Sequence, residues 1–145
     1  MRSRERGAEA VEFALVVPVF LLLVFGVVDF GYMINQDTMV NNASREGARY
    51  GALDPSSATL ITNVVMQDAG TLDPSRITVS VTCLNPPVPP SSTGTLCAGV
   101  FPANATSGGT VIVTVNYQHS WITPVGSTIK PGGMTLTRTT EMRIE

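Results

Sequence analysis

Charged residues, histidine and cysteine are all scarce in this chain. Only 14% of its 145 residues are charged and the formal net charge is −2, whereas a nucleic-acid-binding domain normally carries a concentrated basic face. His119 is the single histidine, and Cys83 and Cys97 are the only cysteines, so with the two cysteines joined in a bridge no zinc site with the usual number of ligands is available. The glycines match no phosphate-binding pattern. These absences predict a protein that is not an enzyme and has no metal, no cofactor, no small-molecule substrate and no nucleic-acid partner.

The chain does contain one long apolar run near its beginning. Phe13 to Val28 carries no charge, and extending the stretch to Ile34 adds only Asp29. As a helix the longer stretch would cover about 33 Å, close to the roughly 30 Å thickness of a bilayer's hydrocarbon core. Three arginines precede it, which favours a cytoplasmic N-terminus by the positive-inside bias. We therefore predict a transmembrane helix over residues 8–34 and an extracytoplasmic domain over residues 35–145.

A cleaved secretory signal peptide is the competing interpretation of this run. Signal peptides have apolar regions of about 7–15 residues followed by a small-x-small cleavage site. The run here is longer, and no such site lies around Gly26 to Tyr32, so we favour a retained anchor. Pro18 predicts a kink or a loosened turn within the helix. For Asp29 we favour a marker of the outer membrane interface over a buried pairing role.

The helix is expected to continue beyond the membrane, over residues 35–52. Ala43, Gly47 and Gly51 recur every four residues, and residues four apart share one face of a helix. They form a seam of small side chains, which lets another helix or a sheet approach closely. We predict that this seam covers a sheet formed by the rest of the domain.

The remaining sequence predicts an α+β domain with a small antiparallel sheet. Asp54-Pro55 suggests the start of a second short helix over 54–69, with aspartate as N-cap and Gly70 closing the helix. Alternating apolar residues predict about three strands, at 77–83, 110–118 and 134–144. The last two strands have no helical pattern between them, which favours antiparallel pairing. Residues 84–109 are rich in Pro, Ser, Thr and Gly, which is typical of a long surface loop.

The two cysteines enclose the first half of this loop. A Cys83–Cys97 bridge would close about 15 residues and contribute about 3 kcal/mol in the chain-entropy treatment. Two free thiols are the alternative, expected if the domain faced the cytoplasm. Because the predicted orientation is extracytoplasmic, we favour the bridge.

A short basic leader ends at Gly7, and the acid Glu12 stands five residues later, directly before the apolar run. This arrangement resembles the processing site of type IV prepilins, particularly those of the Flp/Tad class. The resemblance implies a leader peptide over residues 1–7, cleavage after Gly7 by a prepilin peptidase, and Ala8 as the new N-terminus.

A second stretch sharpens the resemblance. Asn42-Ala43-Ser44-Arg45-Glu46-Gly47-Ala48-Arg49-Tyr50 is similar to the N-A-A-R-E-G-A-R-Y signature of the TadE-like family, and Met134 to Arg143 is similar to that family's terminal strand. The resemblance implies a pilin-like domain and a minor pilin, or pseudopilin, of a Tad/Flp-type pilus. Its partners would be the prepilin peptidase, other pilins, Tad assembly-platform proteins and the lipid membrane. The location implied is the bacterial cell membrane, with incorporation into the pilus as a further step.

The resemblance also implies a role for Glu12. Cleavage creates a cationic amine on Ala8, and Glu12 of one subunit would neutralise that amine on its neighbour within an apolar bundle. Glu9, a second acid near the mature N-terminus, is the alternative partner. The competing function is a single-pass, membrane-anchored extracytoplasmic binding module, which would need neither cleavage at Gly7 nor Glu12.

Overall fold

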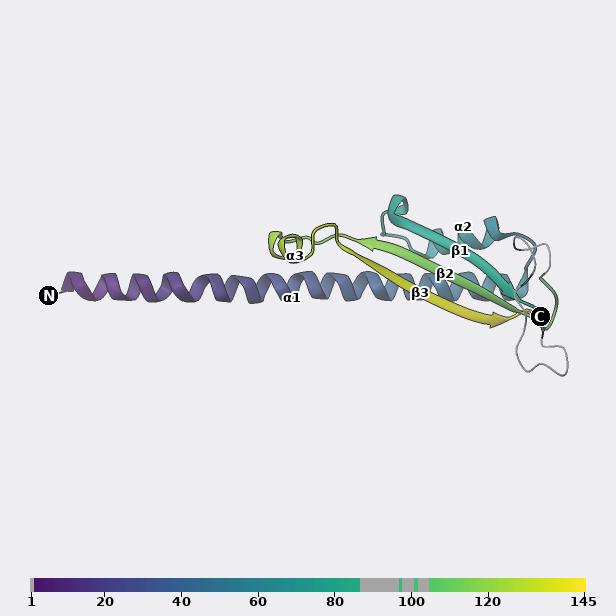
Figure 1. The fold of residues 1–145 in the computed structure, drawn as a ribbon, viewed down its shortest axis with the longest axis horizontal. Coiled ribbons are helices and arrows are strands. Elements are labelled where there is room, and N and C mark those ends of the chain that lie inside the picture. The colour runs from purple at the N-terminus through teal and green to yellow at the C-terminus, as the bar shows by residue number, and fades with distance from the viewer. Residues whose placement is uncertain (1, 87–96, 98–100, 102–104) are drawn as a thin grey trace. The chain divides into compact units, whose positions relative to one another are not determined.

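The computed structural model describes residues 2–86, 97, 101 and 105–145 (Figure 1). In chain order its elements are α1 (Arg2–Leu53), α2 (Ala58–Asp68), the 3-10 turn η1 (Pro74–Arg76), β1 (Ile77–Leu84), β2 (Thr110–His119), α3 (Pro124–Ile129) and β3 (Met134–Arg143). The predicted α+β class, with a long N-terminal apolar helix, a second short helix and a three-stranded antiparallel sheet, is confirmed. The chain forms two compact units: Met1–Ile34 with Ser120–Met134, and Asn35–His119 with Thr135–Glu145.

The helix α1 is 52 residues long and remains helical through Pro18. In the first unit nearly all of its apolar side chains are exposed, among them Phe13 at 69% and Leu15 at 71%. The most apolar part has none of its residues buried, unlike the core helix of a water-soluble fold, and is long enough to cross a membrane. An apolar surface of this extent requires a nonaqueous environment or a partner.

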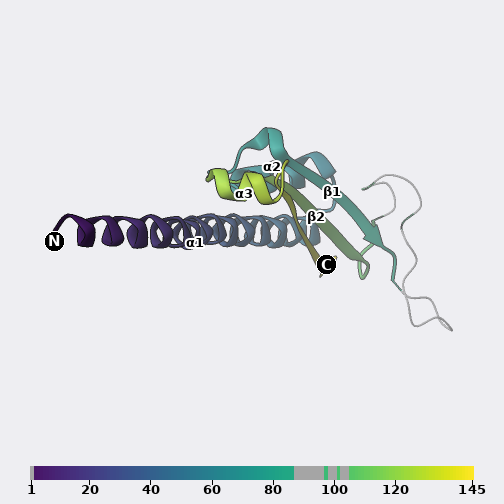
Figure 2. The ribbon, with the colours of Figure 1, turned by 60° about the vertical axis from the view of Figure 1, so that its left-hand side comes forward.

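In the second unit the strands form a sheet in the order β1-β2-β3 (Figures 1 and 2). β1 and β2 are antiparallel, with Ile77 opposite Tyr117 and Leu84 opposite Thr110. β3 follows on the other side of β2, where the Thr139 hydroxyl lies 2.9 Å from that of Thr114. Alternate side chains of β2 all lie in the core, because successive residues of a strand point to opposite faces: Val111, Val113, Val115, Tyr117 and His119.

The seam of small residues on α1 lies against α2 and β2. Ala43 is fully buried. A Cβ atom added at Gly47 would overlap the Val65 side chain of α2 and approach Val113 of β2 at 3.4 Å. A Cβ atom at Gly51 would lie 2.8 Å from Ile61. The two glycines therefore allow a close approach that any larger side chain would prevent.

The predicted start of the second helix is wrong. α2 begins at Ala58, with Ser57 as its N-cap, rather than at Asp54. The Asp54 carboxylate accepts a hydrogen bond from the Ser56 amide at 3.1 Å, two residues along the chain. This Asx-type turn competes with helix formation and separates α1 from α2. Gly70 does follow α2 with a φ of +46°, the left-handed conformation that closes many helices.

Two further differences concern the stretches predicted as loops. Residues 124–129, between the last two strands where no helix was expected, form the helix α3, which Thr123 caps by accepting from the Gly126 amide. The sequence signal was present, since threonine followed by proline is a favoured N-cap and first-turn pair. Of the loop predicted at 84–109, Leu84 belongs to β1 and most of the rest lies outside the described residues.

Candidate functional site

The predicted processing site lies on the first turns of α1. Gly7, Ala8, Glu9 and Glu12 are all exposed, and a Cβ atom at Gly7 would meet nothing within 4 Å. The described part of the chain therefore leaves these residues accessible to an enzyme or a neighbouring subunit. Glu12 follows Ala8 by four residues, so the two share one face of the helix.

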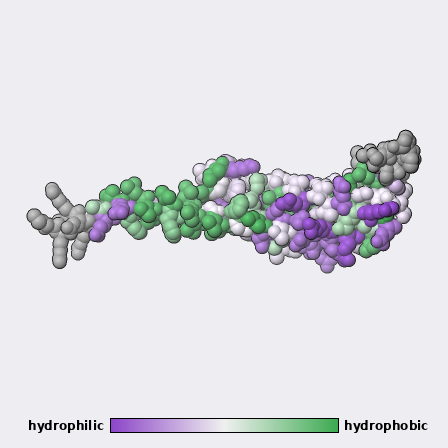
Figure 3. Space-filling model, turned by 90° about the horizontal axis from the view of Figure 1, so that it is seen from below, coloured by the Kyte–Doolittle hydropathy of each residue, from purple (hydrophilic) through white to green (hydrophobic). Residues whose placement is uncertain are grey.

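Between Glu12 and Asp29 the surface of α1 is apolar. Val19, Phe20, Leu23 and Val27 each expose about 60% or more of their surface, and Figure 3 shows this part of the helix as almost continuously hydrophobic. Such a surface suits contact with lipid tails or with the equivalent helices of other subunits.

Asp29 ends this apolar surface, and the structure assigns it a buried role. The side chain is only 4% exposed. One carboxylate oxygen accepts hydrogen bonds from the backbone amides of Ile122 and Thr123, each at 3.0 Å. The other accepts from the Thr123 hydroxyl at 2.5 Å. The favoured prediction of an interface marker did not anticipate these partners, and the pairing alternative describes Asp29 better.

Trp121 and Gly126 complete the surroundings of this carboxylate. The indole N–H of Trp121 donates to the Lys130 carbonyl at 2.8 Å. This hydrogen bond links the chain before α3 to the chain after it. A Cβ atom at Gly126 would lie 2.5 Å from the Asp29 carboxylate and 2.8 Å from the indole ring. Only glycine fits at this position without displacing one of them.

We expect Gly126→Ala to disturb this packing. The added methyl group must push away Asp29 or Trp121, and overpacking of this kind usually destabilises by about 1–3 kcal/mol. Because Trp121 is the only tryptophan, its emission should shift to longer wavelength and become easier to quench with acrylamide. Gly26→Ala is the matched control, since a Cβ atom at Gly26 meets nothing within 4 Å. Identical emission from both variants would contradict the close contact.

In the second unit, polar contacts join the helix to the sheet. The Gln36 side chain is 4% exposed; its carbonyl oxygen lies 2.5 Å from Nδ1 of His119, and its amide donates to the Tyr117 hydroxyl at 3.3 Å. Arg138 of β3 donates from Nε to Asp37 at 2.9 Å and pairs with it again through the guanidinium Nη2. These contacts fix which turn of α1 lies against which strand.

One further ion pair on α1 lies in solvent. Arg49 Nη2 is 2.7 Å from Glu46, with the two side chains 65% and 40% exposed. The hydrogen bond from Arg49 holds the pKa of the Glu46 carboxyl below its usual value. Exposed pairs are screened by water and stabilise little. In the described residues no group of three or more His, Cys, Asp or Glu side chains is placed to hold a metal ion.

A comparison with protein families finds a match over the part of the chain that contains the predicted processing site. Residues 7–49 match the TadE-like protein family. The resemblance to the TadE-like family is thereby confirmed for this segment. A TadE-like segment on an exposed apolar helix indicates a protein associated with a Tad pilus. No curated protein and no solved structure matches the chain.

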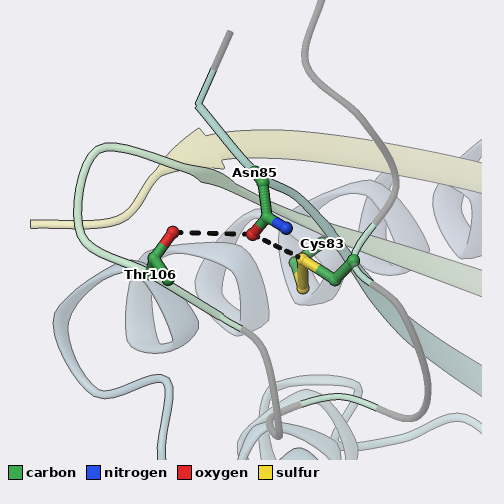
Figure 4. The surroundings of a disulfide bond; sticks show 4 residues. Cys83, Asn85 and Thr106 are labelled. Carbon is green, nitrogen blue, oxygen red and sulfur yellow. Dashed lines mark hydrogen bonds between the residues drawn. A yellow bond between two sulfur atoms is a disulfide. The ribbon is translucent and has the colours of Figure 1, made fainter. Parts of the chain in front are cut away.

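The structure joins Cys83 and Cys97, beyond the TadE-like segment, in a disulfide (Figure 4). The Cys97 amide also donates to the Cys83 carbonyl at 2.9 Å. Asn85 lies beside the bridge, with its side-chain oxygen 3.3 Å from the Cys97 sulfur and 3.5 Å from the Thr106 hydroxyl that donates to it. The bridge therefore ties residues near the end of β1 to the chain that leads into β2.

Sequence reasoning missed the partners of Asp29 and Gln36. Asp29 contacts residues 93 and 94 positions away, and Gln36 contacts His119 at a separation of 83. For Asp29, a single acid within an apolar run was the available signal, because a buried polar group requires a hydrogen-bond partner. Gln36 stands between Asn35 and Asp37 and gave no such signal. Nothing local identified that partner.

Proposed function

We propose that this protein is a minor pilin, or pseudopilin, of a Tad/Flp-type pilus, processed after Gly7 and inserted into the cell membrane through α1. The observation that carries the proposal is the exposed apolar part of α1. It begins directly after Glu12 and lies within the segment that matches the TadE-like family. An apolar helix whose own unit leaves most of its apolar side chains exposed needs lipid before assembly and neighbouring helices after it.

The proposed mechanism is assembly rather than catalysis. Cleavage after Gly7 leaves a cationic amine on Ala8, and Glu12 of one subunit neutralises that amine on the next. When two opposite charges pair in an apolar bundle, their attraction offsets part of the free-energy cost of desolvating them. Either charge alone in the bundle costs several kcal/mol. Glu12 is exposed on α1, so its carboxylate is accessible to a neighbouring subunit.

The proposed orientation places residues 35–145 outside the cytoplasm. Arginines at the N-terminal end favour a cytoplasmic leader, and the Cys83–Cys97 disulfide fits an oxidising compartment. The partners proposed are the prepilin peptidase, other pilins and the Tad assembly-platform proteins. The exposed apolar helix supports the membrane as the site from which assembly starts.

Intact-mass measurement of protein extracted from membranes of a cell with a Tad system should give a mature chain that begins at Ala8. We expect Gly7→Val to accumulate as the uncut form, because the larger side chain crowds the peptidase site. The variant should fold normally, since a Cβ atom at Gly7 meets nothing within 4 Å.

Two other results would contradict the proposal. An uncut wild-type chain in cells that cleave their other prepilins would favour a membrane-anchored binding module. A mature N-terminus beyond Val28 would show a cleaved secretory signal, because the membrane helix would then be lost.

A further inference from the structure

The segment Ser120–Met134 belongs to the same compact unit as the apolar part of α1. It presents two large apolar side chains to the outside: Ile129 is 77% exposed and Ile122 is 57% exposed. No other large hydrophobic side chain in the described residues is as exposed as Ile129. Single exposed isoleucines are common on water-soluble proteins, but these two belong to the unit with the membrane-length helix.

The position of Asp29 along α1 sets the depth of this segment. From Phe13 to Asp29 the helix rises about 24 Å, while the hydrocarbon core is roughly 30 Å thick. If Phe13 marks the inner boundary, Asp29 lies about 6 Å inside the outer boundary. Ile122 and Thr123 bind the Asp29 carboxylate directly, so they lie at nearly the same depth, in the outer part of the hydrocarbon close to the headgroups.

Several polar groups of the segment are paired within it, as membrane depth requires. Ser127 and Thr128 both donate their hydroxyls to the Pro124 carbonyl, at 2.9 and 2.7 Å. The Trp121 indole donates to the Lys130 carbonyl, and the Lys130 amide donates to Gly126 at 3.0 Å. The Asp29 carboxylate, which would be costly alone in hydrocarbon, is occupied by three donors from Ile122 and Thr123.

The composition of the segment fits an interfacial position. Tryptophan is enriched at the membrane–water boundary, and a lysine near it extends its ammonium to the headgroups. An open hollow of about 130 Å³ lies between α1 and α3, with Gly26, Phe30, Trp121, Val125 and Ile129 among its lining residues. Its lining is largely apolar, which suits the end of an acyl chain.

We propose that residues 121–130 form a second membrane contact, seated in the outer interfacial layer with phospholipid as the partner. Ile122 and Ile129 enter the upper hydrocarbon, Lys130 lies among the headgroup phosphates, and the hollow beside Phe30 and Trp121 holds acyl chain. The bonds to Asp29 link this contact to α1 and set how deeply the helix is inserted. The inference rests on the proposed membrane span, but neither on cleavage at Gly7 nor on pilus incorporation.

The single tryptophan provides the test. The full-length protein is reconstituted at low density into phosphatidylcholine–phosphatidylglycerol vesicles whose acyl chains carry bromine at a chosen depth. Bromine near the carbonyl end should remove at least half of the Trp121 emission, whereas bromine near the bilayer centre should remove little. Acrylamide in the water should quench Trp121 less in vesicles than in detergent-free unfolded protein.

Three variants identify the cause. Ile122→Asp with Ile129→Asp should abolish the bromine quenching and restore access to acrylamide. The matched control, Leu53→Asp with Leu60→Asp, makes the same change at leucines that are 62% and 42% exposed in the other unit, and should leave quenching unchanged. Phe20→Trp in a Trp121→Phe background reports on the span itself, and should be quenched by bromine at the bilayer centre.

Three results would overturn the inference. The first is quenching at Phe20→Trp without any quenching of Trp121, which would leave the membrane span intact and remove only the second contact. The second is equal quenching of Trp121 in the Ile122/Ile129 double variant. The third is a Trp121 signal that changes with protein density rather than with bromine depth, which would show that another subunit covers the segment. Loss of quenching at Phe20→Trp would instead contradict the proposed span, and with it the proposed function.

Discussion

Glu12→Ala should leave membrane insertion and cleavage intact while incorporation into the pilus falls by about tenfold or more. Insertion is unaffected because removing a charge next to an apolar run makes transfer into the bilayer easier. Incorporation fails because the Ala8 amine of the neighbouring subunit then has no partner, and removing one member of a buried pair costs about 3–5 kcal/mol. The measurements are the cleavage state by intact mass, the membrane level by immunoblot, and the amount of this protein in sheared pili.

Glu9→Ala is the matched control for this experiment. Glu9 is exposed on the same helix but lies nearer the headgroup region, so its loss should reduce incorporation less. Wild-type incorporation of both variants would remove the pairing mechanism. A defect confined to Glu9→Ala would transfer the role to that residue, and loss of cleavage in Glu12→Ala would place Glu12 in the peptidase's recognition instead.

Gly47→Leu should unfold the second unit at a much lower temperature than the wild type. Even a single Cβ atom at this position would overlap the Val65 side chain, so the larger leucine must force α1 away from α2 and β2. Overpacking of a core costs about 1–3 kcal/mol, and in a domain of this size each kcal/mol lowers Tm by about 4–8 °C. The stability is best followed by hydrogen exchange of the β2 amides, because the membrane helix dominates the helical signal.

Gly31→Leu controls for the change in helix propensity. Leucine favours a helix over glycine by up to about 1 kcal/mol, and a Cβ atom at Gly31 meets nothing within 4 Å. This variant should exchange its β2 amides as slowly as the wild type. Equal protection of β2 in the two variants would show that the seam of small residues does not pack against α2 and β2.

The elements that were predicted closely are those whose signal is local. The strands follow from apolar residues at every second position, and this alternation places Val111, Val113 and Val115 on one face whatever the partner. The small residues Gly47 and Gly51 likewise indicated a close approach, because a glycine inside a helix lowers stability unless it makes room for something. In both cases a pattern within about ten residues carried the information.

The start of the second helix shows where local signals compete. Asp54-Pro55 fits a helix start as well as a turn, since aspartate accepts backbone hydrogen bonds in both. In the structure the Ser56 amide and the Tyr50 hydroxyl both donate to the Asp54 carboxylate. These hydrogen bonds, the one with Ser56 the largest, keep the pKa of that carboxyl below its usual value. The turn was favoured at Asp54, and the second helix starts at Ala58 with Ser57 as its N-cap.

The sequence by itself determined that an apolar helix of membrane length begins just after Gly7 and Glu12, and that an α+β domain follows it. Composition and periodicity suffice for this, because hydrocarbon thickness and strand pleating impose fixed lengths and repeats. Only the tertiary structure decided that Asp29 is buried beneath Ile122 and Thr123. A buried carboxylate needs hydrogen-bond donors. Which backbone amides supply them depends on how segments 93 residues apart in the chain are brought together, and no local sequence pattern specifies that contact.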